Sequence, residues 1–371
     1  MRIYLDNNAT TPLDPEVRQA MVEELATPPS NPSSVHFFGQ EARKRLSKAR
    51  QTIAEVLGVR SSQIIFTSGA TEGVNMLLRG FFSTHGKGHI ISSDIEHSSV
   101  YNTLLALEKQ GATVTLLPAQ EKGFITPEAV AQAVRSDTRL VVLGAVNSET
   151  GIKNPIAEIA ALCEARSIPF VVDGVALLGK ESFTIPPGVS ALAFSAHKFH
   201  GPKGVGFNFI RTSFPCQPLH TGGDQEYTRR AGTENLPGII GLAKAVELFS
   251  LRLPASEIEM RTLRDHFEKA LQTHISDLIV HGKNSPRACN TSCLAFPGVD
   301  GETLLLKLDM AGVCASHGSA CAAGALEPSR VLLNMGLSPI IARSTLRFSL
   351  SRMTTQDEID RAVEILKQVM N

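Results

Sequence analysis

Reactive side chains gather in the stretch 195–204, where Lys198 directly follows His197. Two short apolar runs, 191–194 and 205–210, flank the stretch, so the pattern predicts a strand, a polar turn and a second strand, with Lys198 at the mouth of the turn. A lysine beside a histidine, a serine and glycines at a strand end suits an amine that binds a carbonyl group near an anion. A basic hairpin loop that faces water has the same composition, so this stretch alone leaves both interpretations open.

A turn of small residues, 67–73, follows the predicted strand 64–67 and leads into a helix that begins near Ala70 and Thr71. Small residues at a strand-to-helix turn expose backbone N–H groups at the positive end of the helix, and this arrangement suits a phosphate group. An ordinary capped helix start has the same pattern.

Two further groups stand where predicted strands end. His97 follows the strand 89–92, and it could act as a general acid–base or stack on a flat cofactor, although a surface position at a helix start is equally typical. Asp173 ends the apolar strand 168–173. A carboxylate beside buried apolar residues needs a partner, and a protonated ring nitrogen would be one; capping of the next turn is the alternative.

The strand 140–146 runs into Asn147 and Ser148, whose side chains suit either a ligand or a simple turn. In a parallel sheet, ligands bind beyond the carboxyl ends of the strands, so we expect all these groups at one edge. Together they match a flat cofactor with a phosphate, a ring nitrogen and a carbonyl carbon. Pyridoxal phosphate has these groups, and a lysine Schiff base with an aspartate at the ring nitrogen is its usual protein signature.

The elements that must position these residues alternate along the chain. Unbroken apolar strands separated by helices between residues 64 and 173 predict a mostly parallel sheet covered on both faces. Beyond Gly238 we expect a long helical stretch, broken by Pro254, and then a second set of strands and helices. The 371 residues are therefore predicted to form a large domain, 15–250, and a smaller α+β domain, 251–371, with residues 1–14 packing near the smaller one.

Composition excludes several classes of function. Lys plus Arg and Asp plus Glu number 36 each, so the charge balance predicts no direct nucleic-acid binding and no anionic membrane partner. The apolar runs are too short to span a bilayer, and the first residues are too polar for a secretory signal. The six cysteines contain no CxxC pair, so we expect no metal site and no disulfide framework. Reduced thiols in a cytoplasmic protein fit this pattern best.

Seven motifs in order resemble those of cysteine desulfurases, in the class V aminotransferase family of fold type I pyridoxal phosphate enzymes. They are Tyr4–Thr11, Asn31–Ser34 with His36, Thr67–Glu72, Glu96–His97, Ser195–Gly204, Arg230–Asn235 and Gly318–Cys321. The resemblance implies an α/β fold whose large domain has a mostly parallel sheet of the seven-stranded type and whose C-terminal domain is a smaller α+β unit.

The resemblance also implies a role for each matched residue. Lys198 would bind the cofactor covalently and move protons at the substrate's alpha carbon, His97 would stack on the ring, and Asp173 would keep the ring nitrogen protonated. The substrate carboxylate would be bound by Arg347, beside Asn147 and Ser148. The phosphate would be held by Ala70, Thr71, Ser195 and His197, and by Thr233 of a neighbouring subunit, so a homodimer is implied.

Cys321 would be the nucleophile of such an enzyme. It lies in a run of small residues, 315–324, and its thiolate would take sulfur from L-cysteine, leaving L-alanine and a persulfide. The persulfide would pass to a sulfur-acceptor protein, either an iron–sulfur scaffold or a thiolation carrier. The loop resembles the iron–sulfur assembly and nitrogen-fixation branch more than the branch specialised for selenocysteine-type substrates.

Two positions depart from the family pattern. Ala176 stands where the family has a glutamine that donates to the ring's 3-oxygen, and Ser148 replaces the second asparagine of an Asn-Asn-Glu turn. Both changes fall on one edge of the ring, so slow turnover or altered substrate preference is a hypothesis for this chain. Two alternatives to a desulfurase therefore stay open: another class V activity, such as a lyase or transaminase, and a weakly active homologue that serves sulfur trafficking as a binding partner.

Overall fold

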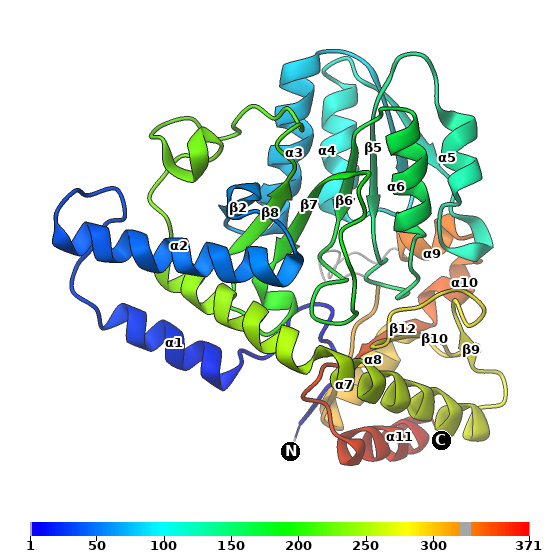
Figure 1. Cartoon of the computed structure of the whole chain (residues 1–371). Helices are drawn as coiled ribbons and strands as arrows, with labels where there is room; N and C mark the ends of the chain where they lie inside the picture. The colour runs from blue at the N-terminus through cyan, green and yellow to red at the C-terminus, as the bar shows by residue number, and fades with distance from the viewer. Residues whose placement is uncertain (1, 319–327, 371) are drawn as a thin grey trace.

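The computed structural model describes residues 2–318 and 328–370, and its largest layer within that part of the chain is a seven-stranded sheet (Figure 1). In spatial order the strands are β2 (Ile64–Thr67), β8 (Gly206–Ile210), β7 (Val189–Ser195), β6 (Phe170–Asp173), β5 (Thr138–Gly144), β3 (His89–Ser93) and β4 (Thr113–Leu117). Neighbouring strands are parallel except where β8 pairs with β2 and β7. The predicted mostly parallel sheet is confirmed.

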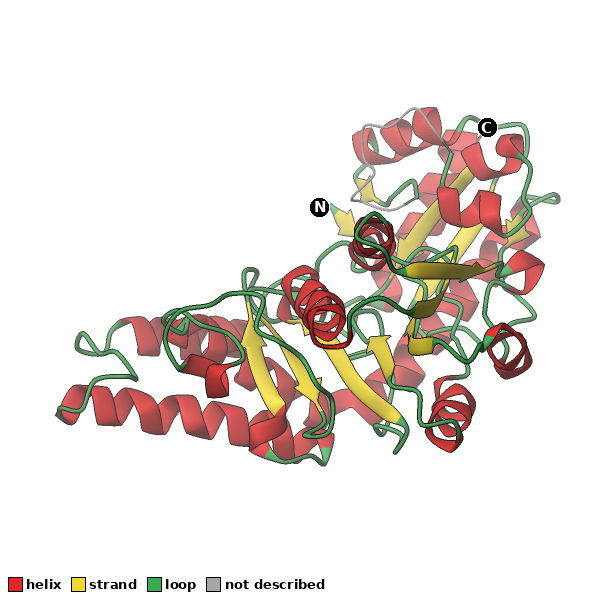
Figure 2. Ribbon diagram, turned by 90° about the horizontal axis from the view of Figure 1, so that it is seen from above, coloured by secondary structure: helices red, strands yellow, loops and turns green. Residues whose placement is uncertain are grey.

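Helices cover both faces of this sheet (Figures 1 and 2). Successive strand residues alternate between two apolar cores: Ile64 and Phe66 belong to one core and Ile65 to the other. The core with Ile65 is closed by α3 (Ala70–His85) and α4 (Ser98–Glu108). The opposite core is closed by α1 (Pro15–Leu25), α2 (Phe37–Leu57), α5 (Pro127–Ala133), α6 (Ile156–Ala165) and the first half of α7 (Leu236–His274).

A second, smaller sheet lies at the far end of α7. Its strand order is β12 (Thr345–Ser349), β10 (Thr291–Ala295) and β9 (Ile279–Val280), and β1 (Ile3–Tyr4) pairs in parallel with β11 (Val313–Cys314) nearby. Ile3 and Leu5 pack into the same apolar core as Phe348. The helices of this region are α8 (Gly301–Met310), α9 (Arg330–Asn334), α10 (Pro339–Arg343) and α11 (Gln356–Met370). The division of the chain at residue 250 stays a prediction.

The helix α7 differs from the sequence-based expectation, because it is continuous through Pro254. Its two halves pack into different cores: Leu242 and Val246 lie against the large sheet, whereas Phe267 and Leu271 lie against the small one. This packing outweighs the one helical hydrogen bond that proline cannot donate. The helix therefore spans both cores as one continuous element, where the sequence suggested a break.

The strand expected at 140–146 also differs, because β5 ends at Gly144. Val146 instead forms an isolated bridge with Lys153, so the chain turns two residues earlier than expected. Among the described residues, no helix is both long enough and apolar enough to cross a membrane.

Candidate active site

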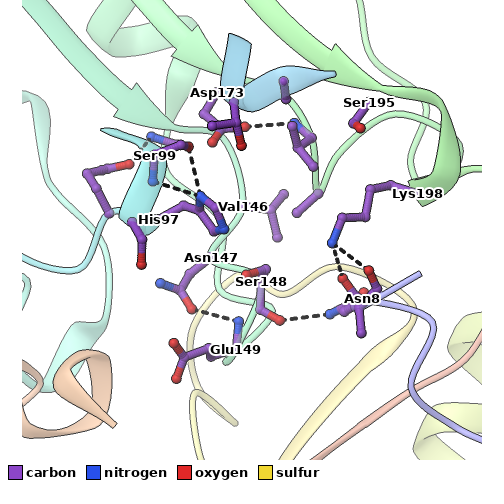
Figure 3. Close-up of a pocket in the computed structure, with 18 of the residues that line it drawn as sticks. Asn8, His97, Ser99, Val146, Asn147, Ser148, Glu149, Asp173, Ser195 and Lys198 are labelled. Atoms are coloured by element: carbon purple, nitrogen blue, oxygen red, sulfur yellow. Dashed lines mark hydrogen bonds between the residues drawn. The ribbon is translucent and has the colours of Figure 1, made fainter. Parts of the chain in front are cut away.

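A cavity of about 740 Å³ lies at the carboxyl edge of the large sheet, where the small sheet and the N-terminal segment meet it (Figure 3). Its volume is in the range of small-molecule and cofactor sites. Ten of the twelve site residues predicted from the sequence line it: Ala70, Thr71, His97, Asn147, Ser148, Asp173, Ser195, His197, Lys198 and Arg347.

Of the other two predicted residues, only Thr233 belongs to the described part of the chain, and it does not line the cavity. Thr233 is exposed in the loop before α7. Cys321 lies outside the described residues, although Gly318 and Pro328, on either side of that segment, both line the cavity.

One end of the cavity is suited to an anion. Ala70 and Thr71 begin α3 there, and within the described chain no side chain caps that helix start. Its first backbone N–H groups therefore offer donors at the positive end of the helix dipole. A Cβ on Gly206 would lie 2.8 Å from the Cα of Gly69, so glycine at position 206 lets this turn lie close against β8. The arrangement fits a phosphate group.

His197 contributes to this end as a neutral ring. Burial lowers the pKa of its imidazole to about 4, and the nearby charges of Lys198, Lys203 and Lys180 act in the same direction. Its Nδ1 lies 3.2 Å from the hydroxyl of Thr10. Near neutral pH the ring can therefore offer an anion a hydrogen bond but no charge.

Lys198 reaches the cavity from the short 3-10 turn η3 (Ala196–Lys198) that follows β7. Its Nζ donates to the backbone oxygens of Asn8, at 2.6 Å, and Ala9, at 3.0 Å (Figure 3). The N-terminal segment thus orients the amine. Asn8 stands in the Tyr4–Thr11 motif, but no local pattern in the sequence predicts these contacts.

Asn8 also links the two sheets. Its side-chain amide donates to the backbone oxygen of Ser148 and to the hydroxyl of Thr291, both at 2.9 Å. Its Oδ1 accepts from the amine of Lys180 at 3.0 Å, and burial lowers the pKa of that amine to about 7. One buried asparagine therefore holds the turn at Ser148, the small sheet and the amine of Lys198 together.

Asp173 ends β6 and lines the same cavity (Figure 3). Only 8% of the residue is exposed, and its Oδ1 accepts from the backbone N–H of Val175 at 3.0 Å. A carboxylate has about four acceptor positions, so capacity remains for a charged ring N–H. His97 lies beside this region and caps α4, because its Nδ1 accepts from the backbone N–H of Ser99 at 3.1 Å. In the neutral ring the hydrogen therefore sits on Nε2.

Arg347 extends from β12 and is almost fully buried. Its Nη2 donates to Asp6 at 2.7 Å and its Nη1 to the backbone oxygen of Ser148 at 3.1 Å. Its Nε is buried and has no hydrogen-bond partner within the described chain. An unsatisfied buried donor is costly, so this atom suits an incoming carboxylate.

The turn after β5 is built by Asn147. Its side-chain oxygen accepts from the backbone N–H groups of Glu149, at 3.0 Å, and Thr150, at 3.1 Å. Arg347 contacts Ser148 through the backbone oxygen, so this contact does not depend on the side chain at position 148. Ala176 is buried in the cavity wall and offers no side-chain hydrogen bond.

Glu96 is a cavity residue that sequence reasoning did not single out beyond its place before His97. Its carboxyl oxygens accept from the hydroxyl of Ser93, at 2.6 Å, and from the backbone N–H of Gly144, at 2.8 Å. Burial raises the pKa of this carboxyl to about 7, and the negative charge of Asp173 adds to the rise. Glu96 therefore carries a proton at mildly acidic pH.

We expect the variant Glu96→Gln to change how stability depends on pH. The folded carboxyl keeps its proton up to about pH 7, whereas an ordinary carboxyl loses it near pH 4.5. The folded state binds more protons in this window, so the contribution of Glu96 is fully present below pH 4.5 and is lost as pH rises through 7. Between pH 4.5 and pH 7, the free energy of unfolding of the wild type should fall by about 3 kcal/mol relative to that of the variant. Thermal unfolding of both proteins at each pH measures this, and a constant difference would contradict it.

The chain matches the family model described as aminotransferase class-V over residues 3–362, so it belongs to the class V aminotransferase family. Among solved structures it is similar to a NifS-like protein, with a TM-score of 0.93 and 34% identity over 100% of this chain and 99% of that one. It is also similar to a structure described as SspA in complex with cysteine, with a TM-score of 0.84 and 32% identity over 95% of this chain and 100% of that one.

The curated relatives are more specific. The chain is 41% identical to cysteine desulfurase IscS of Dictyoglomus turgidum over 372 aligned positions, which cover 99% of this chain and 94% of that protein. It is likewise 41% identical to a cysteine desulfurase of Nostoc sp. over 370 positions, which cover 99% of this chain and 92% of that protein. The resemblance stated from the motifs is confirmed at the level of the family and of these relatives.

Proposed function

We propose that this chain is a cysteine desulfurase, which takes sulfur from L-cysteine and leaves L-alanine and a persulfide on Cys321. The observation that carries the proposal is the meeting of four groups in one cavity: the amine of Lys198, the carboxylate of Asp173, the uncapped start of α3 and the guanidinium of Arg347. The names of the full-length relatives support the same activity.

The cofactor of this reaction would be pyridoxal phosphate. The uncapped helix start at Ala70 and Thr71 suits its phosphate, with Ser195 and the neutral ring of His197 beside it. The remaining acceptor capacity of Asp173 suits its ring nitrogen. When bound, pyridoxal phosphate withdraws electrons from the substrate's alpha carbon and so makes its proton easier to remove.

The chain's own residues would then divide the work. Arg347 would bind the substrate carboxylate through the donor that is unsatisfied in the described chain. Lys198 would hold the cofactor and move a proton at the alpha carbon. His97 would lie on the ring face with its Nδ1 fixed by the start of α4.

Sulfur transfer would use the thiolate of Cys321, which attacks the sulfur of L-cysteine. The carbon–sulfur bond of the substrate breaks, a sulfur–sulfur bond forms on Cys321, and the carbon that loses sulfur gains a proton, which gives L-alanine. Gly318, three residues before Cys321 in the sequence, lines the cavity. A sulfur-acceptor protein, an iron–sulfur scaffold or a thiolation carrier, would then take the persulfide.

The working unit would be a homodimer in the cytoplasm. The exposure of Thr233 outside its own chain's cavity supports a role for this residue in a second copy. The five cysteines within the described residues are free thiols, which suits a reducing compartment.

The experiment that tests this function is a product assay. Purified protein loaded with pyridoxal phosphate is given L-cysteine and a thiol reductant, and alanine, sulfide and pyruvate are quantified. A desulfurase forms alanine and sulfide in equal amounts. Pyruvate in place of alanine would instead indicate a lyase, the second candidate, which the absence of a hydrogen bond from Ala176 favours.

The double substitution Ala176→Gln with Ser148→Asn should raise sulfide release from L-cysteine. Both positions line the cavity, and the longer amide side chain introduced at position 176 could donate to an ionised ring oxygen. A hydrogen bond to a charged group contributes roughly 1.5–3 kcal/mol, which corresponds to an increase of about tenfold or more in rate if it acts in the transition state. The control is Ala176→Leu, which adds bulk without a donor. Equal rates in the parent and the double variant would refute the idea.

A further inference from the structure

Three consecutive residues before α7 have positive φ angles although none of them is glycine: Glu226 (49°), Tyr227 (58°) and Thr228 (61°). L-residues avoid this left-handed region because the Cβ approaches the carbonyl oxygen. Three in succession persist only where the surroundings determine the backbone, and such strain is concentrated at functional sites. Contacts from other parts of the molecule must therefore hold the backbone of this turn.

A buried ion pair holds the turn. Arg50 of α2 donates to both carboxylate oxygens of Glu226, at 2.6 and 2.7 Å, and the two side chains are 8% and 1% exposed. The guanidinium carbon also lies over two rings, 4.6 Å from the centroid of Phe66 and 5.2 Å from that of Tyr227. A bidentate, stacked pair of this kind fixes geometry strongly.

The same pair covers an open sheet edge. β2 is the edge strand of the large sheet, and there the backbone N–H of Phe66 donates to Glu226 at 2.7 Å. The backbone oxygen of Ile64 accepts from Arg50 at 2.6 Å. Glu226 and Arg50 thus take the place of a further strand, and they attach the turn to the strand that leads into the anion end of the cavity.

The chain beyond the turn is anchored once more and then projects outward. Arg230 donates to Glu72, in the first turn of α3, at 2.9 Å. Three residues later Thr233 is exposed and lies outside the cavity lining of its own chain. In the same loop, Nη1 of Arg229 and Oε2 of Glu234 are buried and have no partner within the described chain. Strain, two anchors and unsatisfied polar atoms together indicate a loop that is completed from outside the chain.

We propose that Arg50 and Glu226 are positioning residues that hold the loop 229–235 outward, so that Thr233 completes the anion end of the cavity in a second copy of this chain. The inference rests on the proposed homodimer. Neither residue lines the cavity, so both would act through the backbone of the turn 226–228.

The test is complementation between two variants in one dimer. Glu226→Gln removes the charge and keeps the size, and Lys198→Ala removes the catalytic amine. The two chains carry different affinity tags, are produced together and are purified as the mixed dimer. In that dimer, the intact Lys198 belongs to the Glu226→Gln chain and receives the intact loop of the Lys198→Ala chain. At a pyridoxal phosphate concentration that leaves the Glu226→Gln dimer largely unloaded, the mixed dimer should therefore be more active than the two variant dimers together.

Cofactor binding provides a readout that is independent of turnover. Half-saturation of the Glu226→Gln dimer should need about tenfold more pyridoxal phosphate, the effect of about one lost hydrogen bond. The matched control is Glu24→Gln, which removes the ion-pair partner of Arg45, a residue of α2 like Arg50. The concentration of pyridoxal phosphate at half-saturation should not change in this control. If Glu226→Gln does not fold, Arg50→Lys keeps a positive charge opposite Glu226 but removes the bidentate pairing, and it should give the same two results.

A mixed dimer no more active than the sum of the variant dimers would overturn the inference, and so would unchanged cofactor binding in a folded variant of Glu226 or Arg50. Failure of the proposed function itself would look different. In that case the wild-type dimer would form no alanine from L-cysteine, whichever way the mixed dimer behaves.

Discussion

Replacing Lys198 with alanine should abolish covalent attachment of the cofactor and lower alanine formation from L-cysteine by about 10³-fold or more. The amine of Lys198 lies in the cavity and is oriented by the backbone oxygens of Asn8 and Ala9. The proposed mechanism uses this amine twice, to hold the cofactor and to move the proton of the alpha carbon. Loss of one group therefore removes two functions.

Reductive trapping measures the first of these functions. Borohydride fixes a carbon–nitrogen bond between an amine and pyridoxal phosphate, and mass spectrometry of the digested protein then identifies the modified lysine. The wild type should carry the cofactor on Lys198 and Lys198→Ala should carry none. The control is Lys203→Ala, which changes another lysine of the cavity wall and should leave the trapped product on Lys198. A Lys198→Ala variant with the wild-type rate would rule out the assigned role.

Replacing Arg347 with lysine should lower kcat/KM for L-cysteine by about 10²-fold, mainly through a higher KM. The guanidinium is held by Asp6 and by the backbone oxygen of Ser148, so its planar fork is already oriented before substrate binds. Lysine provides a point charge that cannot make two parallel hydrogen bonds to a carboxylate. It would also leave the carboxylate of Asp6 without the pairing that Arg347 provides.

Steady-state kinetics with L-cysteine measures this effect. The matched control is Arg343→Lys, an exposed arginine at the end of α10, four residues earlier in the chain, and its KM should equal that of the wild type. If Arg347→Lys retained the wild-type KM, the substrate carboxylate would have to bind elsewhere in the cavity.

Much of the site was predictable because of one topological rule. Parallel strands bring their carboxyl ends to the same edge, so Asp173 and Lys198, 25 positions apart in the sequence, were expected near each other and near the start of α3. The structure has them in the same cavity. The alternation of apolar strands and helices also predicted the sheet, because strands that are buried on both faces have few polar positions.

Contacts between segments far apart in the sequence were not predictable in this way. Asn8 reaches Lys198, Ser148 and Thr291 because the N-terminal segment lies between the two sheets, and no local pattern carries that information. Glu96 was named only as the residue before His97, because its burial depends on β5 beside it. Pro254 was expected to break α7, but the helix is continuous there because its two halves pack against two cores.

The measurement that tests the central claim most directly is a single turnover without reductant. The loaded wild-type protein is mixed with less than one equivalent of L-cysteine, and the mass of the peptide that contains Cys321 is compared with the amount of alanine formed. We expect one added sulfur atom on Cys321 for each alanine, and neither product in Cys321→Ser. Alanine formed by Cys321→Ser at the wild-type rate, or sulfur found on another residue, would contradict the central claim.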